Sequence, residues 1–91
     1  MTLPQLSAAL VRLSEFKIGV QEAAMLTCLD EERTNHDIAV MTGFPRSLIW
    51  PVTASLRVKG LLRTQHRGRG DAVHRLTIKG LRMMERVLGN D

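Results

Sequence analysis

Apolar residues recur every three or four positions at the start of the chain, at Leu3, Leu6, Leu10, Leu13 and Phe16. This spacing places them on one face of an amphipathic helix. We expect the helix to begin near Pro4, because proline is favoured in the first helical turn. A second apolar segment follows Gly19 and predicts another helix over residues 20–29.

The pattern predicts a third helix over residues 34–43. Thr34 and Asp37 have the spacing of a capping box, in which two side chains satisfy free amide groups of the first turn. Gly43 then provides a natural helix stop.

The fourth predicted helix, residues 45–59, contains a proline well inside it. Pro51 would remove one helical hydrogen bond and clash with the preceding turn, which costs roughly 3 kcal/mol in a regular helix. We therefore expect the regular helix to begin near Trp50, so that Pro51 lies in its first turn. Residues 45–49 would then form a separate turn. A kinked helix is the alternative.

Two short strands are expected after this helix, at residues 61–65 and 72–78, joined by a glycine-containing turn. The chain then predicts a final helix over residues 79–89, with Leu81, Met84 and Leu88 on one face. The predicted fold is therefore mainly α with a small β-hairpin.

The order of four helices, a two-stranded hairpin and a C-terminal helix is the layout of a winged helix-turn-helix. The chain has 91 residues, a length that predicts one domain over residues 1–91. In this architecture the second helix of the tight pair fits a DNA major groove, which is about 12 Å wide. The hairpin, or wing, can reach the adjacent backbone or the minor groove.

Charge is distributed unevenly along the chain. Residues 1–45 hold three basic and six acidic side chains, a net charge of −3, whereas residues 46–91 hold ten basic and three acidic ones, a net charge of +7. Such asymmetry suits a polyanionic partner such as nucleic acid, although a solvated basic surface is the alternative.

From Lys17 onward the sequence resembles the MarR (multiple antibiotic resistance regulator) family of winged-helix transcription factors. The diagnostic pieces are "SLRVKGLLRTQ", residues 55–65, where the fourth helix leads into the wing, and "LTIKG", residues 76–80, which starts the next helix. The resemblance implies a transcriptional regulator that binds a pseudo-palindromic duplex as a homodimer. Members commonly carry an Asp-x-Arg pair in the wing, which Asp71 with Arg69 or Arg75 would replace here.

The fourth helix is expected to bury Leu48 or Ile49, Val52 and Leu56. Its DNA-facing residues are then Arg46, Ser47, Trp50, Pro51, Ser55 and Arg57. Arg46 lies in the first turn, where recognition helices reach base edges, and an arginine can bond guanine O6 and N7 together.

Two further groups of DNA contacts are expected. Those on the wing are Arg63, Arg67 and Arg69, since arginines beside glycines suit phosphate or a narrow minor groove. Those at the start of the third helix are Thr34, Asn35 and His36, since a helix N-terminus favours phosphate. Capping alone also explains this last group.

Three interpretations of Trp50 remain open at this stage. It can pack in a core that is poor in aromatic residues, press on DNA, or contact a protein partner, because an exposed tryptophan is otherwise unfavourable. In the last case Ile49, Trp50 and Pro51 would form an apolar docking surface on a protein-interaction winged helix. A replication or partition accessory of a mobile element is a third use of the same fold.

The terminal helices, residues 1–16 and 77–89, are expected to be shared with dimerisation. The interface residues would be Leu3, Leu6, Leu10, Leu13, Leu81, Met84 and Leu88. Burying these stripes against a second copy would enlarge a small core. Because the terminal helices are short for the family, we expect no small-molecule effector pocket.

Catalysis and metal binding find no support in the sequence. The three histidines are dispersed, and no nucleophile elbow, phosphate-cradling loop or zinc-ligand spacing occurs, so we expect no enzyme, cofactor or metal. His66 and His74 facing each other across the hairpin would supply only two metal ligands.

The lone Cys28 is expected to be a buried apolar residue. The sequence has no long apolar run and no leader pattern, so we expect a protein of the cytoplasm. The family resemblance implies a bacterial or mobile-element regulator that is associated with the nucleoid and acts as a repressor.

Overall fold

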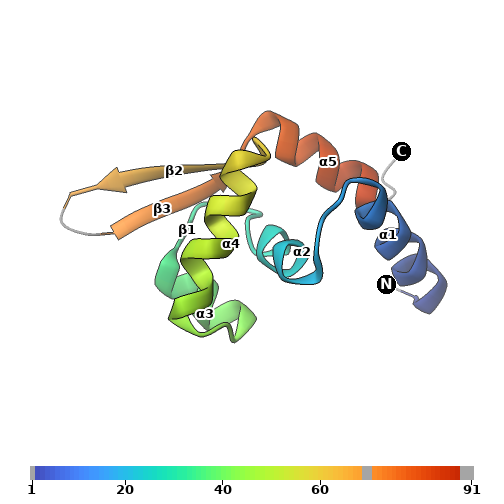
Figure 1. Cartoon of the computed structure of the whole chain (residues 1–91), viewed down its shortest axis with the longest axis horizontal. Coiled ribbons are helices and arrows are strands. Elements are labelled where there is room, and N and C mark those ends of the chain that lie inside the picture. Colours follow the sequence, from blue (N-terminus) through green and yellow to red (C-terminus); the bar gives the residue numbers. More distant parts are fainter. Residues whose placement is uncertain (1, 69–70, 89–91) are drawn as a thin grey trace.

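The computed structural model describes residues 2–68 and 71–88, apart from the side chains of residues 67 and 71. Within these ranges the elements are α1 (Leu3–Glu15), α2 (Val20–Thr27), β1 (Arg33–Thr34), α3 (Asn35–Thr42), α4 (Arg46–Val58), β2 (Leu62–Arg67), β3 (Asp71–Leu76) and α5 (Ile78–Leu88). Helices α1 and α5 lie together at one end, and the β2–β3 wing extends from the other (Figure 1). This is the predicted winged helix-turn-helix.

The sheet has three antiparallel strands in the order β1-β3-β2, not the two that were predicted. The extra strand β1 pairs Arg33 with His74 and Thr34 with Val73. Two residues are too few to show an alternating pattern, so this strand could not be predicted from the sequence. By pairing with β3, β1 joins the base of the wing to the start of α3.

The core lies between the helices and the inner face of the wing. Its fully buried members on the helices come from α2, α3 and α4 and include Met25, Leu26, Ile38, Ile49 and Leu56. Cys28 is buried as predicted, and that burial raises the pKa of its thiol. None of the helices within the described ranges is long and apolar enough to cross a membrane.

Helix α1 packs on α5 at the end of the molecule away from the wing (Figure 1). Arg12 Nη1 donates to the Val87 carbonyl oxygen across this contact at 3.2 Å. Leu13 faces the core, whereas Leu3, Leu6 and Leu10 stay exposed. The predicted stripe is therefore divided between the core of this chain and its surface.

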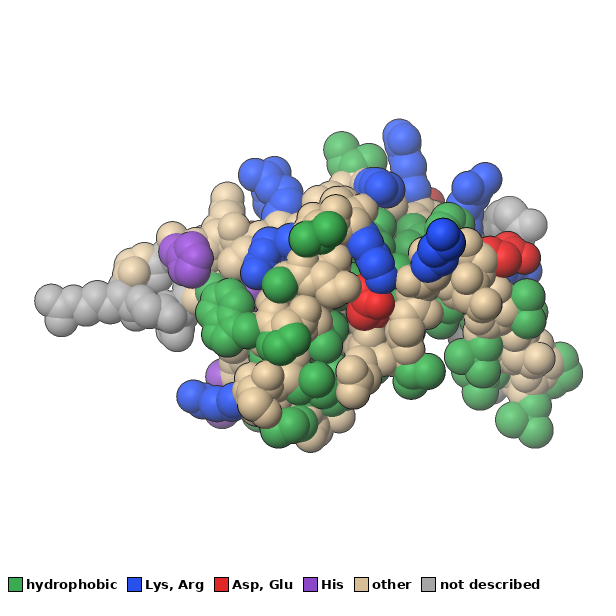
Figure 2. Space-filling model, viewed as in Figure 1, with side chains coloured by type: hydrophobic (Ala, Val, Ile, Leu, Met, Phe, Trp, Pro, Cys, Tyr) green, Lys and Arg blue, Asp and Glu red, His purple; other side chains and the backbone are tan. Residues whose placement is uncertain are grey.

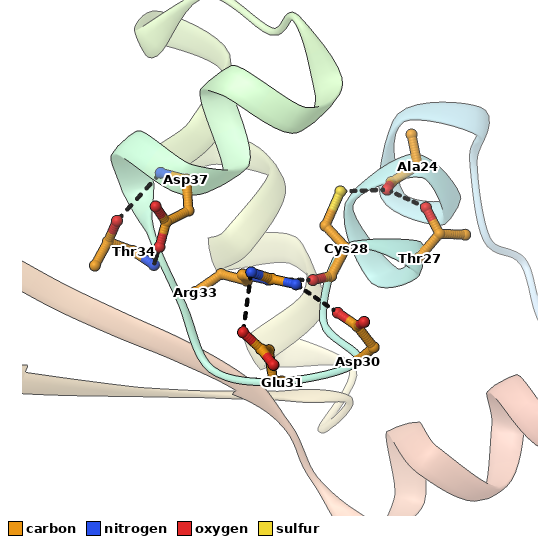
Figure 3. A network of polar contacts seen from close by, with 8 residues as sticks. All are labelled: Ala24, Thr27, Cys28, Asp30, Glu31, Arg33, Thr34 and Asp37. Carbon is orange, nitrogen blue, oxygen red and sulfur yellow. Dashed lines mark hydrogen bonds and ion pairs between the residues drawn. The ribbon is translucent and has the colours of Figure 1, made fainter.

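The start of α3 carries the predicted capping box. Asp37 accepts the Thr34 amide at 3.1 Å, and the Thr34 hydroxyl accepts the Asp37 amide at 3.1 Å (Figure 3). Arg33, next in the chain, bonds the Cys28 carbonyl and the carboxylates of Asp30 and Glu31, which closes the loop between α2 and β1. These contacts fix where α3 begins.

Helix α4 begins at Arg46 and runs through Pro51 without interruption, so the predicted restart near Trp50 is wrong. The missing Pro51 amide would have bonded the carbonyl of Ser47, one turn earlier. Ser47 is exposed and lies in the first turn of α4, so water can satisfy that carbonyl. The Thr53 hydroxyl also donates to the Trp50 carbonyl at 3.0 Å.

An ion pair ties the end of α4 to α2. Lys59 Nζ lies 2.8 Å from Glu22, and the Ser55 hydroxyl donates to the same carboxylate at 3.1 Å. Burial alone would raise the pKa of Glu22, but these hydrogen bonds and one from the Gly19 amide outweigh burial and lower it. The lowered pKa means that this contact stabilises the fold above the ordinary glutamate pKa and is lost as the pH falls.

Candidate nucleic-acid interface

The two faces of α4 divide as the sequence predicted. Ile49, Val52 and Leu56 are buried in the core. Arg46 and Ser47 are exposed at the N-terminal end of the opposite face. Among the described residues Arg46 has no ion-pair or hydrogen-bond partner, so its guanidinium is free to bind a ligand.

Trp50 lies on the exposed face of α4, where it meets the wing. Trp50 is 47% exposed and does not belong to the buried core, so the interpretation that it packs in the core is wrong. The ring edge meets the His74 ring at 6.3 Å between centroids, and the Arg57 guanidinium carbon lies 5.8 Å from the ring centroid. Ile49 is buried, so it cannot join Trp50 and Pro51 in a docking surface.

Two residues that were predicted to contact DNA also make contacts within the chain. Ser55 bonds Glu22, as described above. Arg57 Nη1 donates to the Thr64 hydroxyl on β2 at 2.8 Å while its carbon lies near the Trp50 ring. Their side chains therefore fasten α4 to its neighbours.

A buried histidine, which the sequence analysis considered only as one of two possible metal ligands, joins the wing to α3 and lies close to α4. His74 on β3 is completely buried. Its Nδ1 lies 2.9 Å from the Thr64 hydroxyl, and its Nε2 lies 2.5 Å from the Asn35 side-chain oxygen. Burial, the Arg57 charge and the His66 charge lower its pKa to about 4. The alternation along β3 could have indicated its burial, since His74 falls between Ala72 and Leu76 on the inner face.

Fewer groups at the start of α3 are available to bind a phosphate than the sequence predicted. The Thr34 hydroxyl is engaged in the capping box, and the Asp37 carboxylate lies beside the free amides of the first turn. The Asn35 oxygen bonds His74, which leaves His36 as the exposed member of this group.

The outer face of the wing is cationic. Arg63 on β2 is exposed and pairs directly across the sheet with Arg75 on β3. Arg75 lies 3.9 Å from Glu32. The side chain of Asp71, which was expected to pair with Arg69 or Arg75, lies outside the described residues, so that pairing stays a prediction. Arg69 falls outside the described residues, and so does the side chain of Arg67. His66 pairs with Ala72 rather than His74, so the two histidines do not face each other.

A hollow of about 750 Å³ opens where α1, α4 and α5 meet. Five cationic side chains line it, namely Lys17, Lys59, Lys79, Arg82 and Arg86, around an apolar floor that includes Phe16, Leu61 and Met83. Figure 2 shows basic side chains along the α5 edge and hydrophobic ones over α1. The volume lies in the range of small-molecule sites, about 300–1,000 Å³. The absence of an effector stays a prediction.

The described residues contain no cluster of His, Cys, Asp or Glu arranged to hold a metal ion. No protein-family model matches the chain, and no curated protein sequence matches it. Solved structures do match it over most of its length.

Three of these solved structures illustrate the likeness. A MarR-family transcriptional regulator from Rhodococcus sp. RHA1 has a TM-score of 0.79 at 20% identity, covering 91% of this chain and 61% of that one. YusO from Bacillus subtilis has a TM-score of 0.80 at 18% identity, covering 93% and 63%. A mutant of S. aureus MepR bound to an oligodeoxyribonucleotide has a TM-score of 0.80 at 17% identity, covering 92% and 65%.

The chain has the MarR winged-helix fold. It spans between 55% and 62% of the length of the first three matched structures, so it corresponds to only part of them. In this MarR-like fold α3 and α4 form the helix-turn-helix, and β2 and β3 form the wing, as the resemblance implied.

Proposed function

We propose that this MarR-like chain is a sequence-specific regulator of transcription that binds double-stranded DNA as a homodimer and represses by occluding the promoter. Helix α4 enters the major groove, and the wing lies on the backbone or in the minor groove. One matched structure is named as a MarR-family transcriptional regulator, and another is bound to an oligodeoxyribonucleotide, which supports this class over an enzyme. A cytoplasmic location belongs to the same proposal.

The observation that carries the proposal is the free guanidinium of Arg46 at the exposed N-terminal end of α4. Arg46 is exposed beside Ser47, and neither has a charged partner among the described residues. A recognition helix reads bases with side chains at this end, and an arginine there can bond guanine at two atoms.

The wing adds a second argument. Arg63 and Arg75 lie directly opposite each other on neighbouring strands. Like charges directly opposite each other destabilise a sheet, and Glu32 lies 3.9 Å from Arg75. A DNA phosphate on this face would lower the repulsion between the two arginines, so binding DNA would stabilise the wing.

The homodimer is proposed from the exposed apolar residues at the other end of the molecule. Leu3, Leu6 and Leu10 on α1 and Leu81 and Leu88 on α5 are all exposed. These stripes lie on two helices that pack on each other, so a second copy can cover both at once.

We expect that Leu6→Glu with Leu10→Glu makes the protein monomeric, because two carboxylates cannot be buried unpaired in an apolar interface. Analytical ultracentrifugation measures the mass. Val40→Glu, at an exposed apolar position on α3, is the matched control and should leave the dimer intact. A wild-type protein that sediments as a monomer at high micromolar concentration would contradict the homodimer.

Selection of bound duplexes from a random pool tests the proposed function. We expect enrichment of a pseudo-palindrome whose half-sites are separated by about one helical turn, roughly 10 base pairs. If the protein is folded but no sequence is enriched in the pool, the protein does not recognise a specific DNA sequence.

A further inference from the structure

Four side chains form a continuous hydrogen-bonded chain through the junction of the helix-turn-helix and the wing. Arg57 on α4 bonds Thr64 on β2, Thr64 bonds His74 on β3, and His74 bonds Asn35 on α3. The three contacts measure 2.8, 2.9 and 2.5 Å. We call these four residues the junction network.

The direction of each hydrogen bond follows from the chemistry of the groups. The Asn35 side-chain oxygen can only accept, so His74 Nε2 carries the proton that it donates. Burial lowers the pKa of His74, which keeps the ring neutral and leaves Nδ1 unprotonated. Nδ1 then accepts from the Thr64 hydroxyl, and the oxygen of that hydroxyl accepts from the Arg57 guanidinium, which can only donate.

The junction network also holds Trp50. The indole meets the His74 ring edge-on, at an interplanar angle of 82°, and Arg57 lies near the indole ring. Two of its contacts are therefore with members of the network. Since β2 and β3 carry the wing, the network couples the orientation of Trp50 and α4 to that of the wing.

We propose that Arg57, Thr64 and His74 are positioning residues, which set the wing and Trp50 at a fixed angle to α4 and do not themselves bind DNA. This inference rests on the proposed function for its effect on DNA binding. It reverses the prediction from sequence that Arg57 contacts DNA. Arg57 donates from Nη1 to the Thr64 hydroxyl, and its guanidinium carbon lies 5.8 Å from the centroid of the Trp50 ring, so the structure holds it against the fold.

Two measurements without DNA test the geometry. Nitrogen NMR of the His74 ring at pH 7 should show the neutral form with the proton on Nε2, because Thr64 donates to Nδ1. The fluorescence of Trp50, the only tryptophan, should change in Thr64→Val, which removes both Thr64 hydrogen bonds, and not in Thr27→Val on α2. A His74 ring protonated on Nδ1, or unchanged fluorescence in a folded Thr64→Val, would overturn the network.

Binding to a selected duplex over a series of salt concentrations tests the positioning role. Arg57→Ala and Thr64→Val should each weaken binding roughly tenfold, equivalent to about 1.4 kcal/mol, without changing the slope of log K against log salt. Arg63→Ala, the matched control on the outer face of the wing, should reduce that slope by about 1, the effect of losing one phosphate contact.

A slope that falls by about 1 in Arg57→Ala, with Thr64→Val binding as wild type, would show that Arg57 is a phosphate ligand and overturn the proposal. If no duplex binds the wild-type protein at all, the proposed function fails, and the NMR and fluorescence results then decide the junction network by themselves.

Discussion

Gly80→Ala is expected to destabilise the protein by about 3 kcal/mol or more, a large part of the stability of a domain of this size. A β-carbon on Gly80 would lie 2.2 Å from the Leu61 carbonyl oxygen and 3.1 Å from its carbon. Both are backbone atoms of the connection between α4 and β2, so no side-chain rotation can relieve the clash.

Several hydrogen bonds hold the start of α5 against the connection between α4 and β2. The Thr77 hydroxyl donates to the Gly60 carbonyl at 2.7 Å and accepts the Gly80 amide at 3.0 Å, while the Thr77 amide donates to the Leu61 carbonyl at 3.1 Å. Moving α5 away to accommodate a methyl group would break these contacts and open the core beside Met83.

Urea unfolding followed by circular dichroism measures this effect. Gly19→Ala is the matched control, because a β-carbon there meets only Glu22 Oε1 at 3.6 Å, and it should cost less than about 1 kcal/mol. Equal midpoints for the two alanine variants would mean that α5 does not approach Leu61 as closely as the structure has it.

Arg46→Ala is expected to weaken binding to a selected duplex by about 1–3 kcal/mol while changing binding to unrelated duplexes far less. The reason is that Arg46 lies in the first turn of α4 with a free, exposed guanidinium, which suits bidentate contact with a guanine. The ratio of selected to unrelated affinity should therefore fall, by roughly tenfold to a hundredfold.

Competition binding with both duplexes measures the ratio directly. Arg86→Ala removes one exposed positive charge from the far end of α5 and should leave the ratio unchanged. An Arg46→Ala ratio equal to that of the wild type would exclude Arg46 from base recognition, even if overall affinity fell.

The features predicted correctly from the sequence depend on local periodicity. The spacing of Ile49, Val52 and Leu56 is helical, and these residues form the buried face of α4. The capping box of Thr34 and Asp37 is a signal over four residues and was also correct. Such patterns are set by the geometry of one element, so they can be read without knowing its neighbours.

The features that were missed depend on contacts between elements. Strand β1 exists because β3 offers it a partner, and two residues alone carry no strand pattern. Pro51 lies near the start of α4, and Ser47, whose carbonyl it leaves without a helical partner, is an exposed residue. His74 and Arg57 are 17 residues apart, and only the fold brings both to Thr64. Composition could not distinguish these side chains, which form hydrogen bonds within the fold, from side chains that form none.

Fluorescence anisotropy with a labelled selected duplex, between 50 and 200 mM salt, decides whether the cationic surface of the protein binds duplex DNA. We expect the affinity to fall on the order of a hundredfold over this range, because counterions are released at about four phosphate contacts. If the folded protein binds no duplex at 50 mM salt, or binds the duplex equally well at 200 mM, the proposed DNA binding is wrong.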